Sequence, residues 1–165
     1  MFDRVLAISQ AGRLFSSRMY SYDIDVWENA GQRRLSELRG PRLNDPMPLP
    51  EGISRDNPPP NRIYGLRAPD EGHLWVAMAR RRANWLAHWD NRANAPRPGI
   101  ILDSLYGGRI DLIDLPSKRI VARAEAPQIF VGFLDDDHIL AARYLEDGTP
   151  QFVVSKLTFT PSARR

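Results

Sequence analysis

An arginine- and tryptophan-rich segment, residues 80–97, is the stretch of this sequence whose residue types best suggest binding chemistry. It holds five arginines and a single acid, Asp90, which gives a local charge of +4. Arginine beside tryptophan can hold an anionic group by ion pairing while a ring stacks on the indole. The candidate ligand-binding residues are Arg80, Arg81, Arg82, Trp85, His88, Trp89 and Arg92, with Arg97 beyond them.

Three ligand classes fit that segment: an acidic glycan, a nucleic-acid strand or an acidic peptide. The competing interpretation is a solvated loop whose tryptophans pack against the outside of a sheet. The composition argues against nucleic acid, because 20 acidic residues are interspersed among the 23 basic ones. Apart from Lys118 and Lys156 every basic residue is arginine, a bias typical of a GC-rich genome. We therefore expect a protein or an acidic ligand as the partner.

The histidines and acids do not predict a metal site. His73, His88 and His138 are the only histidines, none has a metal-ligand spacing, and the chain has no cysteine. The run Asp135-Asp136-Asp137 lacks the alternating oxygen ligands of an EF-hand and sits between apolar segments. It therefore predicts a polar turn, as does Glu146-Asp147-Gly148.

Nucleophilic and phosphate-binding motifs are also missing from the sequence. Ser9, Ser16 and Ser17 have no nucleophile-elbow context. Gly107-Gly108 precedes no helix with a P-loop lysine. No catalytic residue, cofactor or metal ligand is assigned from the sequence.

Short apolar strands separated by turns make up the C-terminal part of the chain. Residues 112–115 and 119–122 flank Pro-Ser-Lys, residues 130–134 and 138–141 flank the three aspartates, and residues 151–154 follow Glu-Asp-Gly. Even spacing of short strands with such turns is typical of antiparallel all-β folds, propellers among them.

The N-terminal part continues the β pattern, with two interruptions. Residues 4–8 and 20–27 predict strands, and residues 32–38 can return as a partner strand. Residues 41–60 carry half of the 14 prolines, which lack the N–H that a ladder needs, so they predict an extended loop. A Pro-rich partner ligand there is the weaker alternative. A strand at 73–77 then precedes a predicted short helix around Arg82–Trp89.

Three segments resemble blade motifs of bacterial six-bladed β-propellers of the NHL/TolB-like group. Asp70–Val76 looks like their "DxxGxLWV" motif, and Tyr22–Gly31 resembles their outer-strand hairpin. Asp111–Pro116, followed by Arg119–Ala122, resembles a second hairpin of the same group. The resemblance implies a repeat protein of blade type.

The expected fold is therefore an all-β partial β-propeller of about three antiparallel blades, with a Pro-rich loop and one short helix. Residues 1–41 form the first blade-like unit, 42–62 the Pro-rich loop, 63–160 two further units of which the last is incomplete, and 161–165 a tail. Complete rings of the resembled family have about twice this length, so the chain looks like their C-terminal half. A missing propeller half or a second copy of the chain would complete the ring, with residues 4–8 of one copy pairing with the last blade of the other.

The function expected from these features is that of a non-catalytic binding or scaffold module. One alternative is a propeller-type hydrolase or lyase acting on a lactone or sugar, and another is a polyanion-binding surface on the arginine/tryptophan segment. No apolar run is long enough to span a bilayer, and the N-terminus has no signal-peptide pattern. The absence of cysteine leaves the compartment open, and the resemblance allows a periplasmic or extracellular one.

Overall fold

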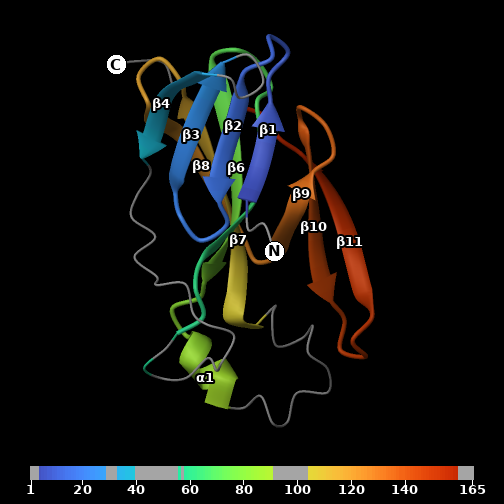
Figure 1. Ribbon diagram of the computed structural model, residues 1–165. Coiled ribbons are helices and arrows are strands. Elements are labelled where there is room, and N and C mark those ends of the chain that lie inside the picture. The colour runs from blue at the N-terminus through green and yellow to red at the C-terminus, as the bar shows by residue number, and fades with distance from the viewer. Residues whose placement is uncertain (1–3, 29–32, 40–55, 57, 91–103, 160–165) are drawn as a thin grey trace, which may run out of the picture.

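The computed structural model describes residues 4–28, 33–39, 56, 58–90 and 104–159. These residues form three antiparallel sheets that follow one another as stacked layers, with one short helix at one end of the molecule (Figure 1). The expected all-β partial propeller of three blades is confirmed. Of the expected Pro-rich loop, residues 42–55 and 57 lie outside the described residues, as does the tail at 161–165.

In each sheet the strands follow one another in sequence order. The first sheet consists of β1 (Arg4–Ile8), β2 (Leu14–Arg18), β3 (Asp23–Glu28) and β4 (Arg33–Arg39). The second consists of β5 (Arg62–Arg67), β6 (His73–Arg81), β7 (Tyr106–Asp114) and β8 (Arg119–Ala126). The third consists of β9 (Ile129–Phe133), β10 (His138–Tyr144) and β11 (Pro150–Lys156), and the helix is α1 (Trp85–Asp90).

Two apolar cores join the three sheets face to face. The first core lies between the first and second sheets and contains Phe15, Ile24, Val26, Leu74, Val76 and Met78 among others. The second lies between the second and third sheets and contains Trp75, Ile110, Leu112, Phe130 and Ile139. Because side chains alternate along a strand, β6 and β7 supply both cores from opposite faces. Trp75 is buried between two sheets, as the blade motif predicted.

The first strands of the three sheets lie next to one another, β1 beside β5 and β5 beside β9. β1 is paired with β2 over its whole length, from Arg4↔Arg18 to Ile8↔Leu14. It is therefore already a member of the first sheet and is not free to complete the third. Among the described residues the third sheet ends at its third strand, β11. The first and second sheets each have a fourth strand, β4 and β8, which pairs with β3 and β7.

The strand and helix boundaries differ from the sequence expectations at several places. β2 was not expected, and β3 begins at Asp23 because a turn closed by the Ser21 N–H and the Arg18 carbonyl precedes it. β6 continues to Arg81 since its last residues pair with β7, which overrides the local helix preference. The helix consequently starts at Trp85. No described helix has the length and apolar character needed to cross a membrane.

Candidate ligand-binding site

The three consecutive arginines stand where the second sheet meets α1. Arg80 and Arg81 are the last residues of β6 and pair with Gly107 and Tyr106 of β7. The next N–H, that of Arg82, donates to the Leu105 carbonyl at 2.9 Å, which holds the turn into α1 against the start of β7. Sheet pairing therefore fixes the backbone of these arginines, which the sequence had placed in a loop or helix.

Two adjoining open hollows share these arginines. One, of about 390 Å³, is lined by Arg80, Arg81, Arg82, Ala83, Asn84, Gly107, Gly108, Glu125 and Ala126. The other, of about 340 Å³, is lined by Asn61, Arg80, Arg81, Arg82, Ala83 and Trp85. The lining residues carry three guanidinium groups and one carboxylate, a local charge of +2. A positive hollow of this kind attracts anionic groups.

Each arginine side chain is held by a partner on a neighbouring strand or connecting segment. Arg80 forms an ion pair with Glu125 of β8. The Arg82 Nη2 donates to the Pro127 carbonyl at 2.6 Å. Arg81 donates from Nη1 to the Pro59 carbonyl at 3.1 Å, and its guanidinium lies 6.0 Å from the centre of the Trp85 ring. These contacts orient the guanidinium groups before any ligand arrives, and an orienting contact reduces the entropy lost on binding.

Glycine makes the floor of the larger hollow. A Cβ on Gly107 would lie 3.1 Å from the Ala126 carbonyl oxygen and 3.9 Å from the Arg82 guanidinium carbon. A Cβ on Gly108 would lie 2.3 Å from the Gln128 carbonyl oxygen, so only glycine fits there. Sequence reasoning did not include Gly107, Gly108 or Glu125 in the site. A Gly-Gly pair inside a strand was the available signal, because it marks close backbone approach.

The structure brings together only part of the set of residues proposed from the sequence. Arg80, Arg81, Arg82 and Trp85 line the hollows, whereas His88 does not and instead lies 3.2 Å from the Asn84 side chain. The Trp89 side chain and Arg92 lie outside the described residues.

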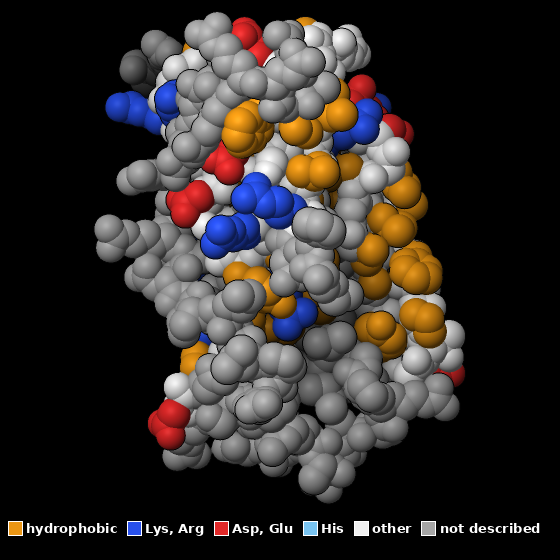
Figure 2. Space-filling view, viewed as in Figure 1, with side chains coloured by type: hydrophobic (Ala, Val, Ile, Leu, Met, Phe, Trp, Pro, Cys, Tyr) orange, Lys and Arg blue, Asp and Glu red, His pale blue; other side chains and the backbone are white. Residues whose placement is uncertain are grey.

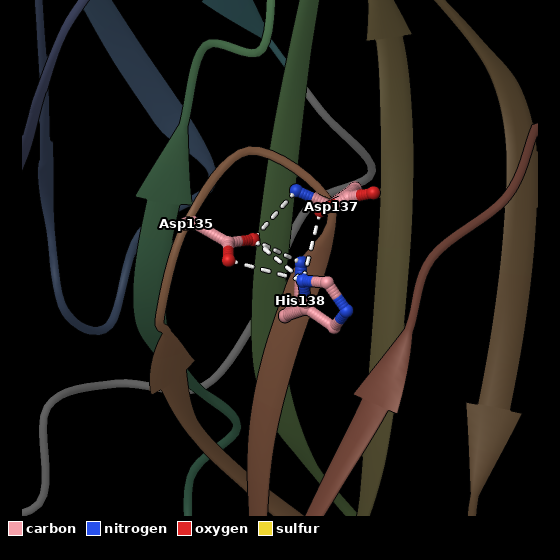
Figure 3. Close-up of side chains that lie close together, drawn as sticks. All are labelled: Asp135, Asp137 and His138. Carbon is pink, nitrogen blue, oxygen red and sulfur yellow. Dashed lines mark hydrogen bonds and ion pairs between the residues drawn. The ribbon is translucent and has the colours of Figure 1, made fainter.

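The other two histidines are held in turns by aspartate. Figure 3 shows His138 facing Asp135 and Asp137, with its Nδ1 at 3.0 Å and 2.8 Å from their carboxylates. The same Asp135 carboxylate accepts the N–H groups of Asp137 and His138 at 3.0 Å and 2.7 Å. As the sequence predicted, the aspartates form a polar turn. Their ligand atoms and the His138 ring lie within 4.8 Å of one another, but hydrogen bonds inside the turn account for that proximity.

The turn between β5 and β6 repeats this arrangement. Asp70 accepts the Gly72 N–H at 2.7 Å and lies 3.0 Å from the His73 Nδ1. Slight burial acts against ionisation of Asp70, but the hydrogen bonds from His73 and Gly72 outweigh it and lower its pKa. The hydrogen bond from the Asp137 N–H is the main cause that lowers the pKa of Asp135. Both histidines therefore have a structural explanation.

A buried charge cluster that the sequence analysis missed lies between the first two sheets. Asp111 is fully buried and accepts two hydrogen bonds from Arg109, at 3.0 Å and 2.8 Å, and two from Arg123, at 2.8 Å and 3.4 Å. Tyr22, which directly precedes β3 of the first sheet, donates to the same carboxylate at 2.9 Å. Burial, followed by the Asp111 charge, raises the pKa of Tyr22 far above its ordinary value. The alternation Arg-x-Asp opposite an arginine was the available sequence signal.

Comparison with known proteins adds no family to this description: no family model matches the chain, and no curated protein matches it.

Proposed function

We propose that this chain is a non-catalytic binding module of blade type, and that its ligand is an acidic partner held in the hollows of Arg80, Arg81 and Arg82. The observation that supports the proposal best is the placement of three sequence-adjacent guanidinium groups around two joined hollows that contain one carboxylate. Strand pairing fixes their backbone, and Trp85 offers an aromatic surface beside them. This combination of fixed charge and stacking surface is typical of polyanion recognition.

The alternative of a lactone- or sugar-cleaving enzyme has less support from the described residues. Such a reaction needs an acid and a base that converge on a substrate in a hollow. The hollows lined by the arginines contain no histidine. A further hollow of about 220 Å³ contains two carboxylates, but Asp25 is paired with Arg4 and Asp23 accepts a hydrogen bond from the Ser21 hydroxyl. His73 and His138 are engaged in their own turns.

Salt-dependent retention on heparin tests the proposal, with heparin as a polyanion probe. The variant carries Arg80→Gln, Arg81→Gln and Arg82→Gln. A matched control carries Lys118→Gln, Arg119→Gln and Arg143→Gln, which removes the same charge from exposed positions outside the hollows. We expect the first variant to bind at least tenfold more weakly with a flatter salt dependence, and the control to change little.

Two results would contradict the proposal. One is an equal loss of retention in both variants, which would show that net charge alone attracts the probe. The other is no retention of the unmodified protein above low salt. The thermal unfolding of both variants should be measured first, because Arg80 and Arg82 also hold β8 and the segment after it. An Arg80→Lys variant keeps the charge and loses the planar fork, and therefore separates simple attraction from oriented contact.

A further inference from the structure

The outer face of the third sheet is apolar and exposed. It is formed by Leu140 and Ala142 on β10 and by Phe152 and Val154 on β11, which the strand register places opposite one another. Phe152 is 60% exposed and Val154 is 56% exposed. Figure 2 shows hydrophobic side chains gathered along this flank of the molecule, over β9 to β11. A contiguous apolar patch of this kind marks an interaction surface.

The outer face of the first sheet lies at the opposite end of the series of three sheets and is partly apolar. Leu6 and Ile8 of β1 are 58% and 61% exposed. Leu14 of β2 lies opposite Ile8, and Trp27 of β3 lies opposite Leu14. Beside them this face is polar on β1 to β3, where Arg4 pairs with Asp25 at 3.6 Å and donates to Ser16 at 2.6 Å. A partner that covered this face would therefore meet apolar side chains beside an ion pair that is already formed.

Equivalent residues of the three sheets can be matched through backbone hydrogen bonds that recur from sheet to sheet. Ser9 N–H donates to the Arg13 carbonyl at 2.9 Å, and Leu134 N–H donates to the His138 carbonyl at the same distance. Leu115 and Leu157, which follow β7 and β11, donate to the Gly72 and Asp137 carbonyls at 2.8 Å and 2.6 Å. The first two bonds match Arg13 with His138. The last two match Gly72 with Asp137, and therefore His73 with His138. Arg13, His73 and His138 are thus equivalent residues of the three sheets.

Equivalent positions that are buried in the first two sheets are exposed in the third. Phe15, Val26 and Ile24 of the first sheet and Trp75, Leu112 and Ile110 of the second are buried against the next sheet. Their counterparts in the third sheet, by the same register, are Leu140, Val154 and Phe152. The outer face of the third sheet thus has the residue pattern of a sheet–sheet interface, and in one chain nothing among the described residues covers it.

The outer face of the first sheet matches the other side of that interface. Leu6, Ile8, Leu14 and Trp27 are equivalent to Leu66, Ala68, Leu74 and Ile113 of the second sheet, all of which are buried against the first sheet. One chain therefore carries both halves of the same type of interface, at opposite ends of its row of sheets.

We propose that the outer face of the third sheet packs on the outer face of the first sheet of a second copy of this chain, head to tail. The contact would continue the series of interfaces that joins the three sheets. Because the two faces differ, the interface is heterologous, and it closes into a ring of two copies where three sheets span half a turn. β1 keeps its pairing with β2 throughout, so no strand is exchanged.

Complementation between two variants tests this contact by sedimentation at tens of micromolar. The first-face variant carries Leu6→Glu and Ile8→Lys, and the third-face variant carries Phe152→Glu and Val154→Lys. We expect the unmodified chain to sediment with about twice its 18.8 kDa mass and each variant alone to be monomeric. An equimolar mixture should recover dimer, because one intact face of each kind remains. Val121→Glu, at an exposed position on β8, is the matched control and should stay dimeric.

Several outcomes would overturn the proposal. They are a monomeric unmodified chain, a ladder of larger species in place of a dimer, dimers of either variant alone, or a mixture that stays monomeric. Dimers of the first-face variant alone would indicate that two third sheets pair with each other. Circular dichroism checks that each variant is folded, and Phe152→Thr with Val154→Thr replaces the charged pair if it is not, since threonine suits a strand.

Discussion

The phenol of Tyr22 and the carboxylate of Asp111 are joined by a 2.9 Å hydrogen bond across 89 residues of sequence. The bond links the first sheet to the second, and both side chains are buried. Arg109 and Arg123 complete the shell of the carboxylate from the second sheet. The contact between the first two sheets therefore combines an apolar core with one fully desolvated charge that depends on donors from both sheets.

Loss of the Tyr22 hydroxyl or of the Asp111 charge should destabilise the fold. We expect Tyr22→Phe to lower the free energy of unfolding by about 1–3 kcal/mol, because the carboxylate loses a buried hydrogen bond. Asp111→Asn should cost about 3–5 kcal/mol, since it leaves two arginines without their buried counter-charge. Urea unfolding of both single variants and the double variant gives the coupling between the two residues. Strictly additive effects would show that the hydrogen bond contributes nothing.

The aspartate–histidine turns predict a dependence of stability on acid pH. The pKa values of Asp70 and Asp135 are lowered in the folded protein, so their contribution is present above the ordinary carboxyl pKa of about 3.9 and is lost as pH falls through the lowered folded value. We expect Asp135→Asn to have a lower melting temperature than the unmodified chain at pH 5, and the difference between the two to be smaller at pH 2. A difference that stays constant between those pH values would show that the carboxylate charge is not responsible.

Strand positions in the C-terminal half could be predicted from the sequence because alternation and turn chemistry agree there. The Asp-rich turn between β9 and β10 and the Pro-Ser-Lys turn between β7 and β8 both separate clear apolar segments. β2 gave no such signal, since Phe15 is followed by Ser16 and Ser17. Both serines are buried, and the Ser17 hydroxyl donates to the Ser21 carbonyl at 2.8 Å. A strand that buries hydroxyl groups reads as a loop until its partners are known.

The sequence indicated that the arginine cluster could bind a ligand, but it did not predict the strand that holds Arg80 and Arg81 or the residues that line the hollow with them. Local composition favours a helix from Arg82, whereas pairing with β7 draws Arg80 and Arg81 into β6. Glu125 and Gly107 reach the hollow only through the folding of β7 and β8 beside it, a contact between residues far apart in sequence. Non-local pairing of this kind leaves no trace in the spacing of residues 80–97.

Trp75 provides a direct test of the core between the second and third sheets. It is 8% exposed and packs with residues of β7, β9 and β10. Trp75→Ala should lower the free energy of unfolding by about 3–5 kcal/mol, because it removes a large buried ring and leaves a cavity. Trp85→Ala is the matched control and should cost less, since that ring, on the first residue of α1, is only half-buried. Equal stability of the Trp75→Ala and unmodified proteins, measured by urea unfolding, would contradict the assignment of this face to a core.

Gly108 and Gly132 form a matched pair that tests how closely the third sheet approaches the second. A Cβ on Gly108 would lie 2.3 Å from the Gln128 carbonyl oxygen and 2.8 Å from the Phe130 ring, whereas a Cβ on Gly132 would meet nothing within 4 Å. Neither glycine has a positive φ angle, so the two sites differ in space and not in backbone strain. We expect Gly108→Ala to lower the free energy of unfolding by about 1–3 kcal/mol, because backbone and ring must both move. Gly132→Ala should change it little, and similar unfolding midpoints for the two variants would show that the segment entering β9 does not press on β7.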